Sequence, residues 1–93
     1  MIPPAGKPAL ASKARLRYDQ ASGGYLLLYP ERGLALNPTA ASILKLCNGE
    51  LTVDGIVERL QREYTDRPGP ELRQDVLEFV EEMARRGLLQ VAG

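Results

Sequence analysis

Apolar and polar positions first follow a regular pattern after residue 14. Within residues 15–20 apolar and charged side chains alternate, which is typical of a strand with one buried face. Further apolar runs occupy residues 25–29 and 34–36, and each follows a short turn sequence that contains glycine. The pattern predicts three antiparallel strands that follow one another along the chain.

The apolar spacing changes to a helical one after Asn37. Asn37 is suited to the N-cap of a helix, and Pro38 is suited to its first position, where no backbone N–H is needed. We expect this helix to end before Asn48-Gly49 and a second helix to begin after Thr52. The second helix has apolar residues at helical spacing, namely Val53, Ile56, Val57, Leu60 and Tyr64.

A third helix is predicted to begin at Pro70 and to end at Gly87. It has two apolar rows. We expect the first row, Leu72, Val76, Phe79 and Met83, to lie in the core. The second row flanks it and consists of Arg73, Leu77, Val80 and Ala84. Two explanations fit this second row: the helix packs in a corner between the sheet and another helix, or the row lines a groove for a ligand segment.

Three strands followed by three helices predict an α+β domain that resembles a winged helix, with a three-stranded antiparallel sheet. We expect residues 15–93 to form this domain. Residues 1–14 contain three prolines and one glycine and show neither strand nor helix periodicity. We therefore expect residues 1–14 to be a mobile N-terminal arm, partly extended because residues before proline avoid the helical region.

The third predicted strand, Leu34–Leu36, is an edge of the sheet and exposes unpaired backbone groups. It contains neither a charged residue nor a proline to prevent pairing. The arm or a second copy of the chain is one explanation for what covers it. The other is β-augmentation, in which an extended peptide pairs with the strand and its side chains enter nearby pockets.

The composition offers little for catalysis. The chain has 93 residues, one cysteine and no histidine, so it has no intrachain disulfide and lacks the commonest general base and metal ligand. We expect Cys47 to be a small buried apolar residue. The acidic side chains of Glu78, Glu81 and Glu82 are best explained as a solvated helix face. We therefore expect that the chain is not an enzyme and uses no cofactor or metal.

The charges are unevenly distributed along a chain of zero net charge. Residues 1–24 carry a balance of +3, whereas residues 52–93 carry −3. Binding to nucleic acid requires clustered basic residues, so the acidic third helix argues against that partner. No segment approaches the ~20 apolar residues of a membrane span, and the N-terminus lacks the apolar core of a signal peptide. We expect a cytoplasmic protein with no membrane partner.

Several stretches resemble the PqqD family of pyrroloquinoline quinone biosynthesis. The clearest is the run from Leu36 to Gly49, LNPTAASILKLCNG, which continues into LTVDGIV at residues 51–57. The turn at residues 29–33, the Asp75-Val76 pair with Phe79, and Gly87-Leu88-Leu89 are also similar. The resemblance covers residues 15–91.

The resemblance implies a peptide chaperone, or adaptor, that binds the precursor peptide PqqA and presents it to the radical S-adenosylmethionine enzyme PqqE. In this family the peptide is held as an added strand on the third strand, against the last helix. Carried over to this chain, the implied peptide-binding residues are Leu34, Ala35, Leu36, Arg73, Leu77, Val80, Glu81 and Ala84.

Two other functions stay open from the sequence. The open strand edge also fits a self-associating structural module, and the order of elements also fits a winged-helix DNA-binding protein. The sequence leaves the choice between monomer and homodimer open.

Overall fold

The computed structural model describes residues 5–30 and 32–92. It is an α+β fold with two antiparallel sheets and three helices. The elements in chain order are β1 (Lys7–Leu10), β2 (Arg15–Asp19), β3 (Gly24–Tyr29), β4 (Arg32–Leu36), α1 (Pro38–Lys45), α2 (Val53–Glu63), α3 (Gly69–Arg85) and β5 (Leu89–Ala92).

Strands β2, β3 and β4 form the predicted three-stranded antiparallel sheet in the order β2-β3-β4. In the register of β3 and β4, Leu27 lies opposite Leu34, and Tyr25 lies opposite Leu36. Because side chains alternate between the two faces of a strand, these residues share the face that is turned to the core. Leu27 is the fully buried residue of the sheet, and Leu34 and Leu36 are half-buried beside the core.

The predicted helix ends are confirmed. The Asn37 side chain accepts a hydrogen bond from the Ala40 N–H at 2.8 Å, and Thr52 caps α2 in the same way through the Gly55 N–H at 3.1 Å. After α3, Gly87 adopts a φ of 75°, a conformation that residues with a side chain rarely take. Its N–H and that of Leu88 then bond to carbonyls of the last turn of α3.

The N-terminal segment differs from the expected arm. Residues 7–10 form β1, which pairs antiparallel with β5 in a separate two-stranded sheet. The segment is also attached to the loop before α2, because the Pro8 carbonyl accepts a hydrogen bond from the Gly49 N–H at 2.9 Å. Pro8 itself is fully buried. Residues 7–10 are extended, but they are paired in a sheet and are not the mobile arm that the sequence led us to expect, while residues 1–4 lie outside the described residues.

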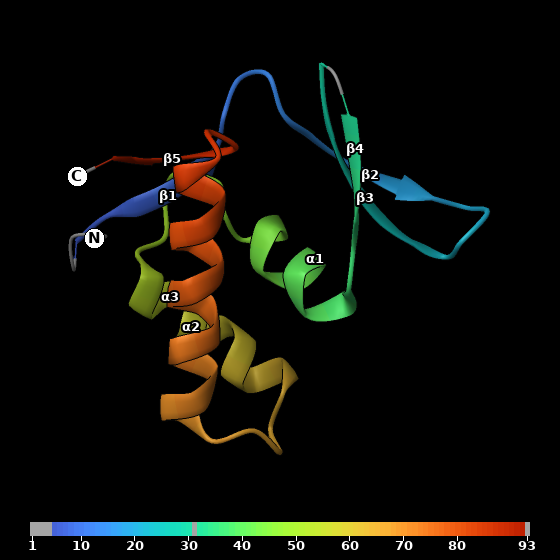
Figure 1. Ribbon diagram of the computed structural model, residues 1–93. Coiled ribbons are helices and arrows are strands. Elements are labelled where there is room, and N and C mark those ends of the chain that lie inside the picture. Colours follow the sequence, from blue (N-terminus) through green and yellow to red (C-terminus); the bar gives the residue numbers. More distant parts are fainter. Residues whose placement is uncertain (1–4, 31, 93) are drawn as a thin grey trace.

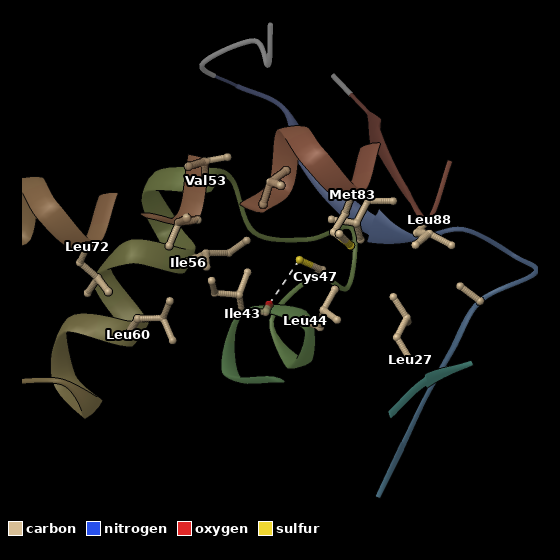
Figure 2. Packing of buried hydrophobic residues seen from close by; sticks show 14 residues of the cluster. Leu27, Ile43, Leu44, Cys47, Val53, Ile56, Leu60, Leu72, Met83 and Leu88 are labelled. Atoms are coloured by element: carbon tan, nitrogen blue, oxygen red, sulfur yellow. Dashed lines mark hydrogen bonds between the residues drawn. The ribbon is translucent and has the colours of Figure 1, made fainter. Parts of the chain in front are cut away.

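The core lies among the three helices. Its fully buried side chains are Ile43, Leu44, Ile56, Leu60, Leu72, Val76 and Val80, joined by Leu27 from the sheet and Pro8 from β1. Figure 2 shows Leu27 approaching this cluster from the sheet, next to Leu44. Phe79 was expected in the core but is only half-buried, and Val80 takes its place. The core arc of α3 is therefore rotated toward the predicted flank.

The β2-β3-β4 sheet stands beside the helices rather than over them. In Figure 1 the helix α1 lies between this sheet and the pair formed by α2 and α3. The segment between β1 and β2 crosses from the upper end of α3 to the sheet. The start of α1 and one flank of α3 border a groove.

Candidate functional site

The outer edge of β4 is the first part of the candidate site. In the described part of the chain β4 pairs only with β3, so its other edge has no strand partner. Ala35 and Gly33 are exposed, whereas Leu34 and Leu36 turn toward the core. An edge with small exposed residues and no charge between Gly33 and Leu36 is accessible to an added strand.

A groove of about 450 Å³ begins where β4 ends. Asn37, which directly follows β4, contributes to one wall, and Phe79 of α3 contributes to the other. Phe79 is half-buried and packs against the core, so part of its ring remains open to the groove. The complete set of lining residues is Asn37, Thr39, Ala40, Ile43, Arg67, Asp75, Glu78, Phe79 and Glu82. The floor is apolar and the rim is charged.

Arg67 is paired with two carboxylates at one end of the groove. Its guanidinium donates to the carboxylate of Asp75 and, at 2.9 Å, to that of Glu71. These hydrogen bonds, that to Asp75 foremost, raise the pKa of Arg67 above its ordinary value. Two carboxylates share one cation here, so this end of the groove stays slightly acidic.

Glu82 is held in a similar way at the other end of the rim. Its carboxylate accepts hydrogen bonds from Arg85 and, at 2.8 Å, from Nε of Arg86. The hydrogen bond from Arg85, followed by that from Arg86, lowers the pKa of Glu82. The groove therefore has paired charges at Asp75 and Glu82, and its apolar lining consists of Ala40, Ile43 and Phe79.

The structure separates the α3 residues that the sequence grouped into one contact surface. Val80 is completely buried in the core, and Leu77 is half-buried against it. Arg73 forms an ion pair with Asp54 of α2, so its row is turned toward α2. Ala84 is half-buried, whereas Glu81 is exposed. The first of the two explanations, a helix packed against other elements, describes this row best, although its neighbours are α2 and β5 rather than the large sheet.

The groove instead uses the opposite flank of α3, formed by Asp75, Phe79 and Glu82. Sequence reasoning missed this row because Phe79 shares a helical arc with Leu72, Val76 and Met83 and was assigned to the core with them. One signal was available: Asp75 and Glu82 stand at i−4 and i+3 from Phe79 and are neighbours on the helix surface. An aromatic residue between two carboxylates indicates the border of a buried face.

Cys47 is buried, as expected, and is unsuited to chemistry. Its Sγ donates a hydrogen bond to the Ile43 carbonyl at 3.3 Å, drawn as the dashed line in Figure 2. Burial raises the pKa of the thiol to about 12, so the reactive thiolate is absent near neutral pH. Among the described residues no group of three or more His, Cys, Asp or Glu side chains is placed to hold a metal.

The sequence of residues 24–89 matches the family described as Coenzyme PQQ synthesis protein D (PqqD). This chain belongs to the PqqD family. A relative from Rhodopseudomonas palustris (strain BisB5), named PqqA binding protein, is 38% identical over 95% of this chain and 85% of its own length. A protein of the same name from Methylococcus capsulatus is 38% identical over 87% of this chain and 84% of its own length.

Two solved structures have the same fold. The solution structure of the PqqD truncation of Methylobacterium extorquens PqqCD has a TM-score of 0.81 and 30% identity, and covers 97% of this chain and 95% of its own. That protein is described as a functional, stand-alone recognition element for ribosomally synthesized and post-translationally modified peptides. The crystal structure of PqqD from Xanthomonas campestris has a TM-score of 0.59 and 29% identity, over 97% and 99% of the two chains.

The helices of the described chain are too short or too polar for any of them to cross a membrane.

Proposed function

We propose that this chain is a PqqA-binding adaptor, and that PqqA adds a strand to the outer edge of β4. The observation that supports this most directly is the combination of the unpaired β4 edge and the groove beside Phe79. The relatives named PqqA binding protein support the identity of the peptide. The chain performs no catalysis in this proposal.

The two parts of the site have different roles in binding. The edge of β4 supplies backbone hydrogen bonds, which hold any extended peptide with little preference for its sequence. The groove receives side chains of the peptide and therefore supplies the selectivity. From the contact residues expected earlier we keep Leu34, Ala35 and Leu36. On α3 the geometry favours Phe79 and its neighbours over the row that contains Val80.

We further propose that the bound peptide is presented to PqqE. A disordered peptide loses conformational freedom when it pairs with β4, and this cost keeps the affinity moderate. Moderate affinity allows the peptide to leave for the enzyme. The adaptor thus raises the local concentration of PqqA and fixes one part of it while the remainder stays accessible.

Calorimetric titration of this chain with synthetic PqqA tests the proposal. We expect saturable binding with a dissociation constant near 1 µM, about −8 kcal/mol, and a matched peptide of scrambled sequence should bind more weakly. Binding in the millimolar range or no binding at all would contradict it. Adding PqqE to the preformed complex should yield a ternary species in sedimentation velocity.

The rival functions give different results in simple measurements. A DNA-binding winged helix would be retained on heparin at low salt, but the acidic rim of α3 predicts that this chain passes through. A self-associating module would use the β4 edge for a second copy, so its mass in light scattering would rise with concentration. PqqA would then compete with self-association.

A further inference from the structure

A second hollow lies near the other end of β4. It has a volume of about 250 Å³ and is lined by Lys13, Tyr29, Pro30, Arg86 and Leu88. These residues come from three places: the segment between β1 and β2, the end of β3 with the turn that follows it, and the turn between α3 and β5. In Figure 1 this region is where the segment after β1 crosses from α3 to the sheet.

The polar groups of this hollow are hydrogen-bond donors. Lys13 contributes an ammonium group and Tyr29 a hydroxyl group, and neither has a hydrogen-bond or ion-pair partner within residues 5–30 and 32–92. Arg86 uses Nε to bond the carboxylate of Glu82 at 2.8 Å, which leaves other guanidinium N–H groups available. No described carboxylate lines the hollow. It therefore offers the ammonium group of Lys13, the remaining N–H groups of an Arg86 that is already paired with Glu82, and a hydroxyl group to an acceptor from outside.

The end of α3 does not by itself account for these cations. Basic groups often lie near helix C-termini, where carbonyl groups without partners carry partial negative charge. Here the carbonyls of Glu82, Met83 and Ala84 already accept the N–H groups of the turn that follows. Lys13 lies above that turn, since a Cβ on Gly87 would be 3.9 Å from its Nζ. The ammonium group thus lies near a turn in which three carbonyls already accept backbone N–H groups.

The hollow and the groove lie toward opposite ends of the β4 edge. β4 begins two residues after Pro30, which lines the hollow, and ends next to Asn37, which lines the groove. On α3, Phe79 lies at the groove, and Arg86 just beyond the helix lies at the hollow. A strand of five residues spans roughly 17 Å, so a short segment paired with β4 runs from the end near Pro30, at the hollow, to the end near Asn37, at the groove.

We propose that the hollow between Lys13, Tyr29 and Arg86 binds a carboxylate of the segment that pairs with β4. This inference rests on the proposed function and adds a charge preference to it. A carboxylate accepts hydrogen bonds from all three groups, and the apolar Pro30 and Leu88 suit the aliphatic stem of an acidic residue. The carboxylate belongs either to an Asp or Glu side chain of the peptide or to the C-terminus of the peptide.

A double-mutant cycle between protein and peptide tests this. The protein change is Lys13→Gln, and the PqqA changes replace each Asp by Asn and each Glu by Gln in turn, with a further C-terminally amidated peptide. We expect Lys13→Gln to weaken PqqA binding about three- to fivefold, as for a partly exposed ion pair. One peptide change should weaken binding to the unchanged protein equally and have no further effect on the variant. That peptide identifies the carboxylate and its source.

The matched control is Arg59→Gln, which removes an exposed positive charge from α2 away from the hollow. This variant should bind PqqA as tightly as the unchanged protein, and both variants should retain their thermal unfolding midpoint. The effect of Lys13→Gln on affinity should also diminish with added salt, whereas the affinity of the control should not depend on its substitution at any salt concentration.

If every acidic peptide variant loses the same affinity for Lys13→Gln as for the unchanged protein, the proposed carboxylate site is wrong, although the proposal that the chain binds PqqA is unaffected. If the unchanged protein fails to bind PqqA, both proposals fall together.

Discussion

The helices and the β2-β3-β4 sheet are held in very different ways. The helices contribute most of the fully buried side chains, among them Ile56, Leu72 and Val76. The sheet contributes Leu27 as its fully buried residue, and its remaining core contacts are half-buried. The sheet also touches the helices mainly through α1. The stable part of the molecule is therefore distinct from the part with the open edge.

This difference has a functional meaning. A binding edge must keep backbone groups unpaired, which a closed core cannot tolerate. The chain separates the two requirements, because the helices supply most of the fully buried apolar side chains while the outer edge of β4 remains available. The groove lies at the boundary between the helical core and the open edge. Phe79 marks this boundary because it is half-buried, packs against the core and also lines the groove.

The largest effect is expected from a cavity in the helical region. Leu72 is fully buried, so Leu72→Ala should lower the free energy of unfolding by about 3 kcal/mol. Urea unfolding followed by circular dichroism measures this. The affinity of the remaining folded protein for PqqA should be nearly unchanged. A large loss of affinity at low urea would show that the two regions are not independent.

Val80 and Phe79 are adjacent on α3 but lie on different sides of the boundary between the core and the groove. Val80→Ala should lower the free energy of unfolding by about 2 kcal/mol and leave PqqA affinity unchanged, because its side chain is completely buried. Phe79→Ala should weaken PqqA binding about tenfold, because its side chain faces the groove. Calorimetry and chemical unfolding on both variants decide this. The opposite result for Val80 would restore the contact row predicted from the sequence.

The pKa of the buried Cys47 thiol tests how well the helical core excludes water. Burial raises its pKa from 9.0 to about 12, so the unfolded chain ionises first as the pH rises. The thiol therefore contributes stability that is fully present below pH 9 and is lost between pH 9 and about 12. At pH 10 the loss should be about 1.4 kcal/mol relative to pH 8. A Cys47→Ala variant should lack this loss, and equal pH profiles would show that the site admits water.

The smallest effect is expected at Gly55, near the start of α2. A Cβ there would make ordinary contacts, 3.4 Å from Leu51 and 3.5 Å from Thr52. Gly55→Ala should therefore raise the free energy of unfolding by about 0.5 kcal/mol, since alanine favours the helix. Thermal unfolding measures the change. A decrease would indicate that the contact with Leu51 is too tight.

The local parts of the fold could be predicted from the sequence. The three strands, the caps at Asn37 and Thr52 and the end at Gly87 depend on residues that are close together in the chain. The open edge of β4 followed from strand order alone. Such features are determined by the periodicity of apolar residues, by turn-forming residues and by helix-capping residues.

Long-range features were beyond the sequence patterns. The pairing of β1 with β5 joins segments at opposite ends of the chain, and neither alternates clearly between apolar and polar residues. A helical-wheel projection of α3 shows that its apolar arc is wide, but it does not show which side of that arc faces α2. The ion pair of Arg73 with Asp54 and the burial of Val80 settle that only in three dimensions.

The central claim is that PqqA adds a strand to β4. Hydrogen exchange of the backbone amides, with and without PqqA, tests it most directly. We predict that alternate amides within Arg32–Leu36 gain protection when PqqA binds, because every second N–H of an edge strand points away from its partner. The outer edge of β2 serves as the control, since it too has no strand partner within residues 5–30 and 32–92, and its exchange should not change. Unchanged exchange in β4 with PqqA bound, or protection gained at β2 instead, would contradict the account.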